Sequence, residues 1–176
     1  AEAIQSLREV SSLAEGTAEE VQTTARTVRS AVRAGGSAAA AAYLQRSPNA
    51  WDLLAAWDKW LSGRITEGRT ASALVVLTAD LLNQRGGVGA SGVNTVDVQL
   101  DGLARQVLQP KRLRALYSQL GSGSRVPSAC ALAVLAAAVR RGRQLAWEVL
   151  RSVDWTLAAL SKLATPPKLP KGGASA

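Results

Sequence analysis

The sequence predicts an all-α fold of stacked helical hairpins, an α-solenoid of the HEAT or armadillo kind. Composition is the first indication: 47% of the 176 residues are apolar, Phe is absent and only two residues are Tyr. Ala, Leu and Val dominate the apolar set, and Ala and Leu favour helices, whereas Ile, Tyr and Phe, which are common in strands, are nearly missing. The second indication is that apolar residues recur at helical spacing between short turn signals along most of the chain.

Residues 1–36 are predicted to form two helices. Apolar residues at helical spacing over residues 2–15 indicate an amphipathic helix. Thr17 with Glu20 three residues later is typical of a capping box, which begins a helix that runs to about Arg33. Gly35-Gly36 is expected to end that helix.

Three helices are predicted next, each with a recognisable beginning. Ser37 begins an alanine-rich helix that ends near Arg46. Ser47-Pro48 places a capping residue and a first-turn Pro before a helix over 49–61. A further helix follows over about 68–84, with leucines in helical register.

The second half begins with a Gly-rich stretch, 85–92, which is predicted to be a flexible loop. Apolar and polar residues alternate just after it, as in a strand, but a helical spacing also extends over 94–108 and favours a helix. Pro110 is expected to begin the next helix, and residues 127–141 form the most apolar helix of the chain.

Two more helices are predicted near the C-terminal end, over 143–151 and 154–164. The sequence therefore divides into an N-terminal helical hairpin, residues 1–36, and a helical-repeat domain, residues 37–164. Residues 165–176 are rich in Pro and Gly and are predicted to be a disordered tail.

The sequence lacks the residues that several kinds of functional site require. The chain has no His and one Cys, which excludes an internal disulfide and a four-ligand zinc site built from His and Cys. The Gly-rich stretch 85–92 lacks the Lys-Ser/Thr ending of a phosphate-binding loop. The longest uncharged apolar run that could serve as a membrane span is Val126 to Val139, and it is too short, because a span needs about 20 residues. We expect no catalytic, cofactor-binding or metal site, no small-molecule substrate, no membrane contact and no enzymatic activity.

The five Trp residues are predicted to have two kinds of role. Trp57, Trp147 and Trp155 lie among leucines at helical spacing, which indicates core packing. Trp51 and Trp60 flank the apolar face of their helix, so an exposed ring for stacking on a base is the alternative for them.

Two acidic side chains and the single thiol have simpler interpretations. Asp52 and Asp58 are six residues apart on different helix faces, and we expect them to be solvated partners of Arg46 or Lys59. Cys130 lies in the most apolar helix and is predicted to be an inert core thiol.

The charge of the chain is concentrated in its second part. Residues 1–101 carry nine basic and eleven acidic groups, whereas residues 102–176 carry twelve basic and two acidic groups. The second part thus has a formal charge of +10, from twelve minus two, within a total of +8. Such a field attracts polyanions, and RNA is the natural candidate. The alternatives are an acidic protein, an anionic membrane surface, or a solvated surface that only confers solubility.

The candidate RNA-binding residues are the cations that this second part groups at turns and helix ends. Arg forks match the geometry of phosphate groups, and such contacts position an RNA without reading its sequence. A charge that only complements a helix C-terminus is the alternative for Arg140 and Arg141. The candidates are Arg105, Lys111, Arg112, Arg114, Arg125, Arg140, Arg141, Arg143 and Arg151.

Three collinear segments resemble the N-terminal region of the nucleolar pre-ribosomal-associated protein family, also called unhealthy ribosome biogenesis protein. They are residues 43–58 (YLQRSPNAWDLLAAWD), 100–120 (LDGLARQVLQPKRLRALYSQL) and 128–164, which includes the corner from Val139 to Gly142. At Val153-Asp154-Trp155 the chain has Val where the family usually has an aromatic residue.

The resemblance implies a helical-repeat, non-catalytic scaffold of early large-subunit (60S) assembly in the nucleolus. It implies association with pre-rRNA and with ribosome assembly factors, including a DEAD-box RNA helicase. The alternative is a protein-only helical adaptor, whose apolar faces bind partner helices without direct RNA contact.

Overall fold

The computed structural model describes residues 5, 7, 10–64, 66–86, 95–121, 125–142, 144 and 147. Within these residues all regular structure is helical, which confirms the all-α class for the described part. The predicted helices over 143–151 and 154–164 and the predicted tail lie outside it, apart from residues 144 and 147. The elements are α2 (Ala18–Arg46), η1 (Pro48–Ala50), α3 (Trp51–Leu61), α4 (Gly68–Leu82), α5 (Thr95–Val107), α6 (Pro110–Gly121) and α7 (Arg125–Arg141).

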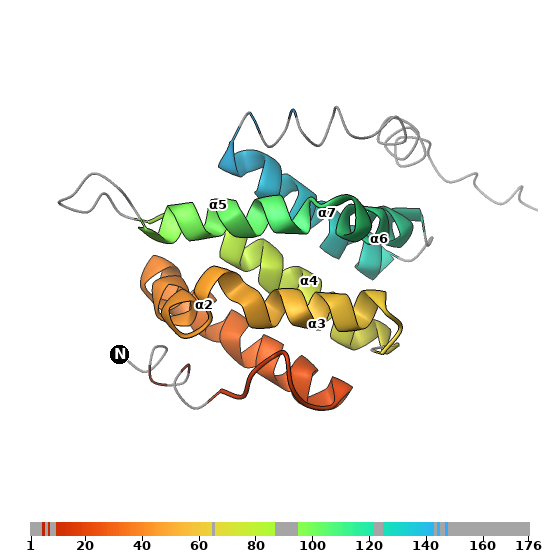
Figure 1. Cartoon of the computed structure of the whole chain (residues 1–176), viewed down its shortest axis with the longest axis horizontal. Coiled ribbons are helices and arrows are strands. Elements are labelled where there is room, and N and C mark those ends of the chain that lie inside the picture. Colours follow the sequence, from red (N-terminus) through yellow and green to blue (C-terminus); the bar gives the residue numbers. More distant parts are fainter. Residues whose placement is uncertain are drawn as a thin grey trace, which may run out of the picture.

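The central element is α4, which lies between α2 on one side and α7 on the other (Figure 1). Its leucines Leu74, Leu77 and Leu82 are almost wholly buried, and smaller buried residues such as Ala71 and Thr78 adjoin them. A helix that is apolar around most of its circumference is stable only when other helices cover it. The helices α5 and α6 complete the layer beside α7 (Figure 1).

The predicted capping box at the start of α2 is confirmed. The Thr17 Oγ1 accepts a hydrogen bond from the Glu20 N–H at 3.3 Å, and the Glu20 carboxylate accepts one from the Thr17 N–H at 2.7 Å. As predicted, the helical path breaks at Gly36: its φ of 57° is a conformation that suits Gly, and two helical segments meet there at a kink within α2. The predicted domain boundary falls on this kink, and Val28 and Leu44 on either side of it belong to one core.

The helix predicted over 2–15 is wrong for its second half, because residues 10–15 are not helical. Arg46 instead holds this segment, since its guanidinium donates to the carbonyls of Leu7, at 2.6 Å, and Val10. Leu13 is fully buried. An isolated helix of this length is marginal, so contacts with the rest of the fold decide the path of the segment.

Asp52 is buried, and the prediction that it is solvated is wrong. Its carboxylate accepts hydrogen bonds from the Tyr43 hydroxyl and the Ser47 hydroxyl, both at 2.5 Å, and lies 3.5 Å from the Leu13 N–H. Burial and the neighbouring Asp52 charge raise the pKa of Tyr43 well above its usual value. Asp52 therefore ties the N-terminal segment, the end of α2 and the start of α3 together.

The described Trp residues divide differently from the prediction. Trp57 is a fully buried core residue, as predicted, and its Nε1–H donates to the Thr78 Oγ1 at 3.1 Å. Trp60 packs edge-to-face on Trp57, with ring centroids 5.3 Å apart. Trp147 is 64% exposed, so its predicted core role is wrong, and Trp51 is 51% exposed. Trp155 lies outside the described residues.

Candidate nucleic-acid interface

Three of the candidate cations gather where α5 ends and α6 begins. Arg105 lies in the last turn of α5, and Lys111 and Arg114 lie in the first turns of α6, which starts at Pro110 as predicted. All three side chains are exposed, and none is paired with another described residue. A helix N-terminus is an unfavourable place for cations, so Lys111 and Arg114 gain nothing from the dipole of their own helix. We call these three residues the α5–α6 corner.

Arg112 lies in the same turn but points inward. Its guanidinium donates to both carboxylate oxygens of Asp58, each at 3.0 Å, and to the Gln106 carbonyl at 2.9 Å. Its side chain is only 12% exposed. The partner of Asp58 is therefore an arginine from a distant helix, rather than the neighbouring Lys59. Arg112 joins α6 to α3, and its donors are largely engaged within the protein.

Arg141 is the most buried of the candidates, with a side chain 1% exposed. Its guanidinium donates to the carboxylates of Asp97, at 2.7 Å, and Asp101, at 2.6 Å. It also donates to the carbonyls of Leu82, Gln84 and Asp97 at 3.1, 2.7 and 3.2 Å. The last carbonyls of a helix lack partners within the helix, and Arg141 supplies a donor for the carbonyl of Leu82, the last residue of α4. This placement removes Arg141 from the set of side chains that are free to contact phosphate.

The acids around Arg141 are affected in turn. Burial alone would raise the pKa of Asp97, but the hydrogen bonds from Arg141 and the Gly86 N–H, with the charges of Arg141 and Arg85, lower that pKa below its usual value. The Gly86 N–H lies 3.2 Å from the Asp97 carboxylate. Asp97 is therefore ionised at neutral pH and balances part of the charge of Arg141.

We call Arg141 with its partners Asp97 and Asp101 the junction, and Arg140 and Arg85 form a second exposed basic site beside it. The Arg140 guanidinium lies 3.3 Å from the Asn83 Oδ1, and the Arg140 carbonyl accepts a hydrogen bond from Arg85 at 2.6 Å. Arg85 was not among the candidates, because it begins the predicted Gly-rich loop and its closeness to α7 depends on tertiary structure. The side chains of Arg125, Arg143 and Arg151 lie outside the described part of the chain.

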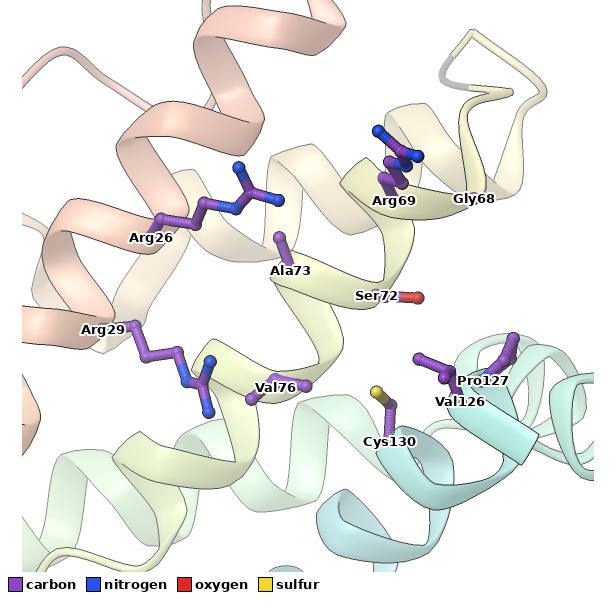
Figure 2. A pocket seen from close by; sticks show the side chains of 10 residues that line it. All are labelled: Arg26, Arg29, Gly68, Arg69, Ser72, Ala73, Val76, Val126, Pro127 and Cys130. Carbon is purple, nitrogen blue, oxygen red and sulfur yellow. The ribbon is translucent and has the colours of Figure 1, made fainter. Parts of the chain in front are cut away.

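A third basic site lies in the part of the sequence whose formal charge is negative. Arg26 and Arg29 of α2 and Arg69 of α4 surround a groove of about 630 Å³ (Figure 2). The beginning of α7 closes the other side, and its Cys130 lines the groove. The formal charge summed over residues 1–101 is negative and gave no sign of this site. The spacing of Arg26 and Arg29 did give one, because residues three apart share one face of a helix.

Cys130 differs in part from its prediction as a core thiol. It is half-buried, and it packs against the core while its sulfur points toward α4 across the groove (Figure 2). Burial raises the pKa of the Cys130 thiol, against the smaller effect of the nearby Arg29 charge. The thiol is therefore protonated at neutral pH and a weak nucleophile.

In the described part of the chain, no group of three or more His, Cys, Asp or Glu side chains is arranged to hold a metal ion. None of the described helices combines the length and apolar character that crossing a membrane requires.

The fold and its surface define the chain as an all-α protein with exposed basic sites. The family profile described as "Ribosome 60S biogenesis N-terminal" (Npa1) matches residues 51–175, and the chain belongs to this family. The match confirms the resemblance to the nucleolar pre-ribosomal-associated family and connects the chain with 60S ribosome biogenesis. No curated protein and no solved structure shows a significant match.

Proposed function

We propose that this chain is a non-catalytic scaffold of early 60S biogenesis that binds pre-rRNA through the α5–α6 corner. The scaffold acts in the nucleolus and associates with assembly factors, among them a DEAD-box RNA helicase. Its helices are part of a helical-repeat, HEAT- or armadillo-like α-solenoid. Membership of the 60S biogenesis family supports the pathway, and the exposed cations of the corner support the RNA contact.

The observation that carries the RNA contact is the absence of acidic partners at the corner within the described residues. Arg105, Lys111 and Arg114 are exposed and form no ion pair there, whereas Arg112 and Arg141 are engaged by Asp58, Asp97 and Asp101. An unpaired surface cation can neutralise a phosphate and release its counterion without first breaking a contact inside the protein. Backbone contacts of this kind suit structured RNA, which is recognised largely by its shape.

The test is binding of the purified chain to a large-subunit pre-rRNA fragment, beside an unrelated structured RNA of equal length, at about 50 and 200 mM salt. We expect salt-sensitive binding with a preference for the pre-rRNA. Changing Arg105, Lys111 and Arg114 to Gln together should lower the affinity at low salt by at least about tenfold. The slope of log affinity against log salt should fall in magnitude by about 2 to 3, because each lost phosphate contact contributes slightly less than one unit.

The matched control changes Arg26, Arg64 and Arg69 to Gln, which removes the same charge from exposed positions that are not part of the corner. An equal loss of RNA affinity in both triple variants would show that net charge alone attracts the RNA. Unchanged affinity in the corner variant would contradict the proposed contact.

The second candidate function is the protein-only helical adaptor, and the groove between α2, α4 and α7 favours it. Apolar side chains are accessible in that groove, as a surface for a partner protein requires. An adaptor would retain its partner at high salt and would show no preference between the two RNAs.

A further inference from the structure

The groove between α2, α4 and α7 has a composition that differs from the other basic sites. Its floor is made by aliphatic residues of α4 and α7, among them Ala73, Val76 and Pro127 (Figure 2). Val126, at the start of α7, lines it and is 66% exposed. An exposed aliphatic side chain beside a hollow is surface that a partner can bury.

The cations around this floor are available to different degrees. Arg29 is paired with Asp80 at 2.7 Å, which holds its side chain in place beside the floor. Arg26 and Arg69 are exposed and have no ion-pair or hydrogen-bond partner among the described residues. The groove therefore offers an aliphatic floor with two unpaired positive charges and one paired charge beside it.

We propose that this groove binds a short amphipathic segment of a partner protein, which inserts aliphatic side chains between flanking Asp or Glu residues. Aliphatic side chains gain free energy in proportion to the apolar surface that they bury, and the floor supplies a matching apolar surface. Carboxylates beside them would pair with Arg26 and Arg69, since arginine forks bind carboxylates through two parallel hydrogen bonds. A helix whose apolar residues are spaced three and four apart is one segment that presents such a pattern.

The lining of the groove favours a peptide over a nucleotide. Sites that hold single-stranded nucleic acid combine positive charge with aromatic side chains on which the bases stack. Among the residues that the structure describes, no aromatic side chain lines this groove, and its floor is aliphatic. The inference is independent of the RNA proposal, because the two sites share no residue.

The test compares three probes by fluorescence anisotropy on the full chain. The first is a synthetic peptide with leucines at helical spacing flanked by glutamates. The second replaces its leucines with serines at the same charge, and the third is an oligouridine with the same number of negative charges. We expect the leucine peptide to bind at least about tenfold more tightly than the serine peptide, since burial of the leucine side chains is favourable and the serines bury little apolar surface.

Cys130 provides a second readout that needs no substitution. It is the one Cys in the sequence and it lines the groove, so its rate of reaction with a disulfide reagent reports occupancy. We expect the leucine peptide to slow this reaction and the oligouridine to leave it unchanged. Equal protection by the serine peptide would mean that charge alone holds the ligand, and preferential protection by the oligouridine would assign the groove to nucleic acid. Either result overturns the proposal.

Two substitutions with a matched control localise the site. Arg26→Glu together with Arg69→Glu should lower the affinity for the leucine peptide at least about tenfold, because both contacts with the peptide's carboxylates become repulsive. Arg64→Glu with Arg105→Glu makes the same change of charge at exposed positions outside the groove lining and should have a much smaller effect. Val126→Ser should lower the affinity for the leucine peptide and leave the affinity for the serine peptide unchanged. An equal loss of affinity for the leucine peptide in both double variants would overturn the assignment to this groove.

Discussion

The junction around Arg141 and the α5–α6 corner are both rich in basic residues of the same half of the sequence, yet they differ in what faces the cations. At the junction, Asp97 and Asp101 of α5 pair with Arg141, whose side chain is 1% exposed. At the corner, Arg105 and Lys111 are exposed and have no acidic partner among the described residues. A count of cations therefore does not locate a binding surface. The acids that the fold places opposite each cation decide whether it stabilises the protein or remains available to a ligand.

Arg141→Ala should have the largest effect on stability. It removes five hydrogen bonds from a buried guanidinium and leaves two carboxylates and three carbonyls of the junction without this donor. Loss of one partner from a buried ion pair costs about 3 to 5 kcal/mol, and the partial exposure of both acids favours the lower end of that range. Urea unfolding followed by circular dichroism measures this loss.

The control for this prediction is the neighbouring Arg140→Ala, which changes an exposed side chain and should alter the free energy of unfolding by less than about 0.5 kcal/mol. Similar losses for the two variants would contradict the division between a structural Arg141 and an available Arg140.

Arg112→Met should have an intermediate effect of about 1 to 2 kcal/mol. The Arg112 side chain is 12% exposed, but that of its partner Asp58 is 49% exposed, so solvent screens the pair more than at the junction. Met keeps much of the apolar stem and removes the donors. The same unfolding measurement, with Arg114→Met as the control from the same helix, would show whether Arg112 belongs with the structural cations. A loss as small as that of Arg114→Met would place it with the exposed ones.

The acid sensitivity of the junction should be smaller and has a definite sign. The pKa of Asp97 is lower in the folded protein than its usual value, so the folded state binds the proton more weakly than the unfolded state does. The stability that this carboxylate contributes is present above its ordinary pKa of about 4 and is lost as the pH falls through the folded value.

Asp97→Asn tests that sign, because it removes this titration. Unfolding free energies measured from neutral pH down to about pH 3 should fall less steeply for the variant than for the parent chain. Parallel curves would indicate that other carboxylates account for the acid sensitivity and that the pairing of Asp97 with Arg141 contributes little.

The sequence by itself determined the helices, because the signals that begin and end a helix act over a few residues. The capping box of Thr17 and Glu20 and the start of α6 at Pro110 are where they were predicted, and the helix predicted over 68–84 is observed as Gly68–Leu82. Residues 10–15 depart from the prediction, because hydrogen bonds from the distant Arg46 to the backbone of this part of the chain compete with a helix too short to be stable alone.

Tertiary structure alone decided which charges remain available. Arg141 and Asp101 are 40 positions apart in the sequence, Arg112 and Asp58 are 54 apart, and Leu13 and Asp52 are 39 apart. The groove likewise depends on α2, α4 and α7 meeting, although its arginines belong to the acidic part of the sequence. Hydrogen bonds within a helix connect residues four apart, whereas these pairs depend on how whole helices pack, and local patterns carry no information about that packing.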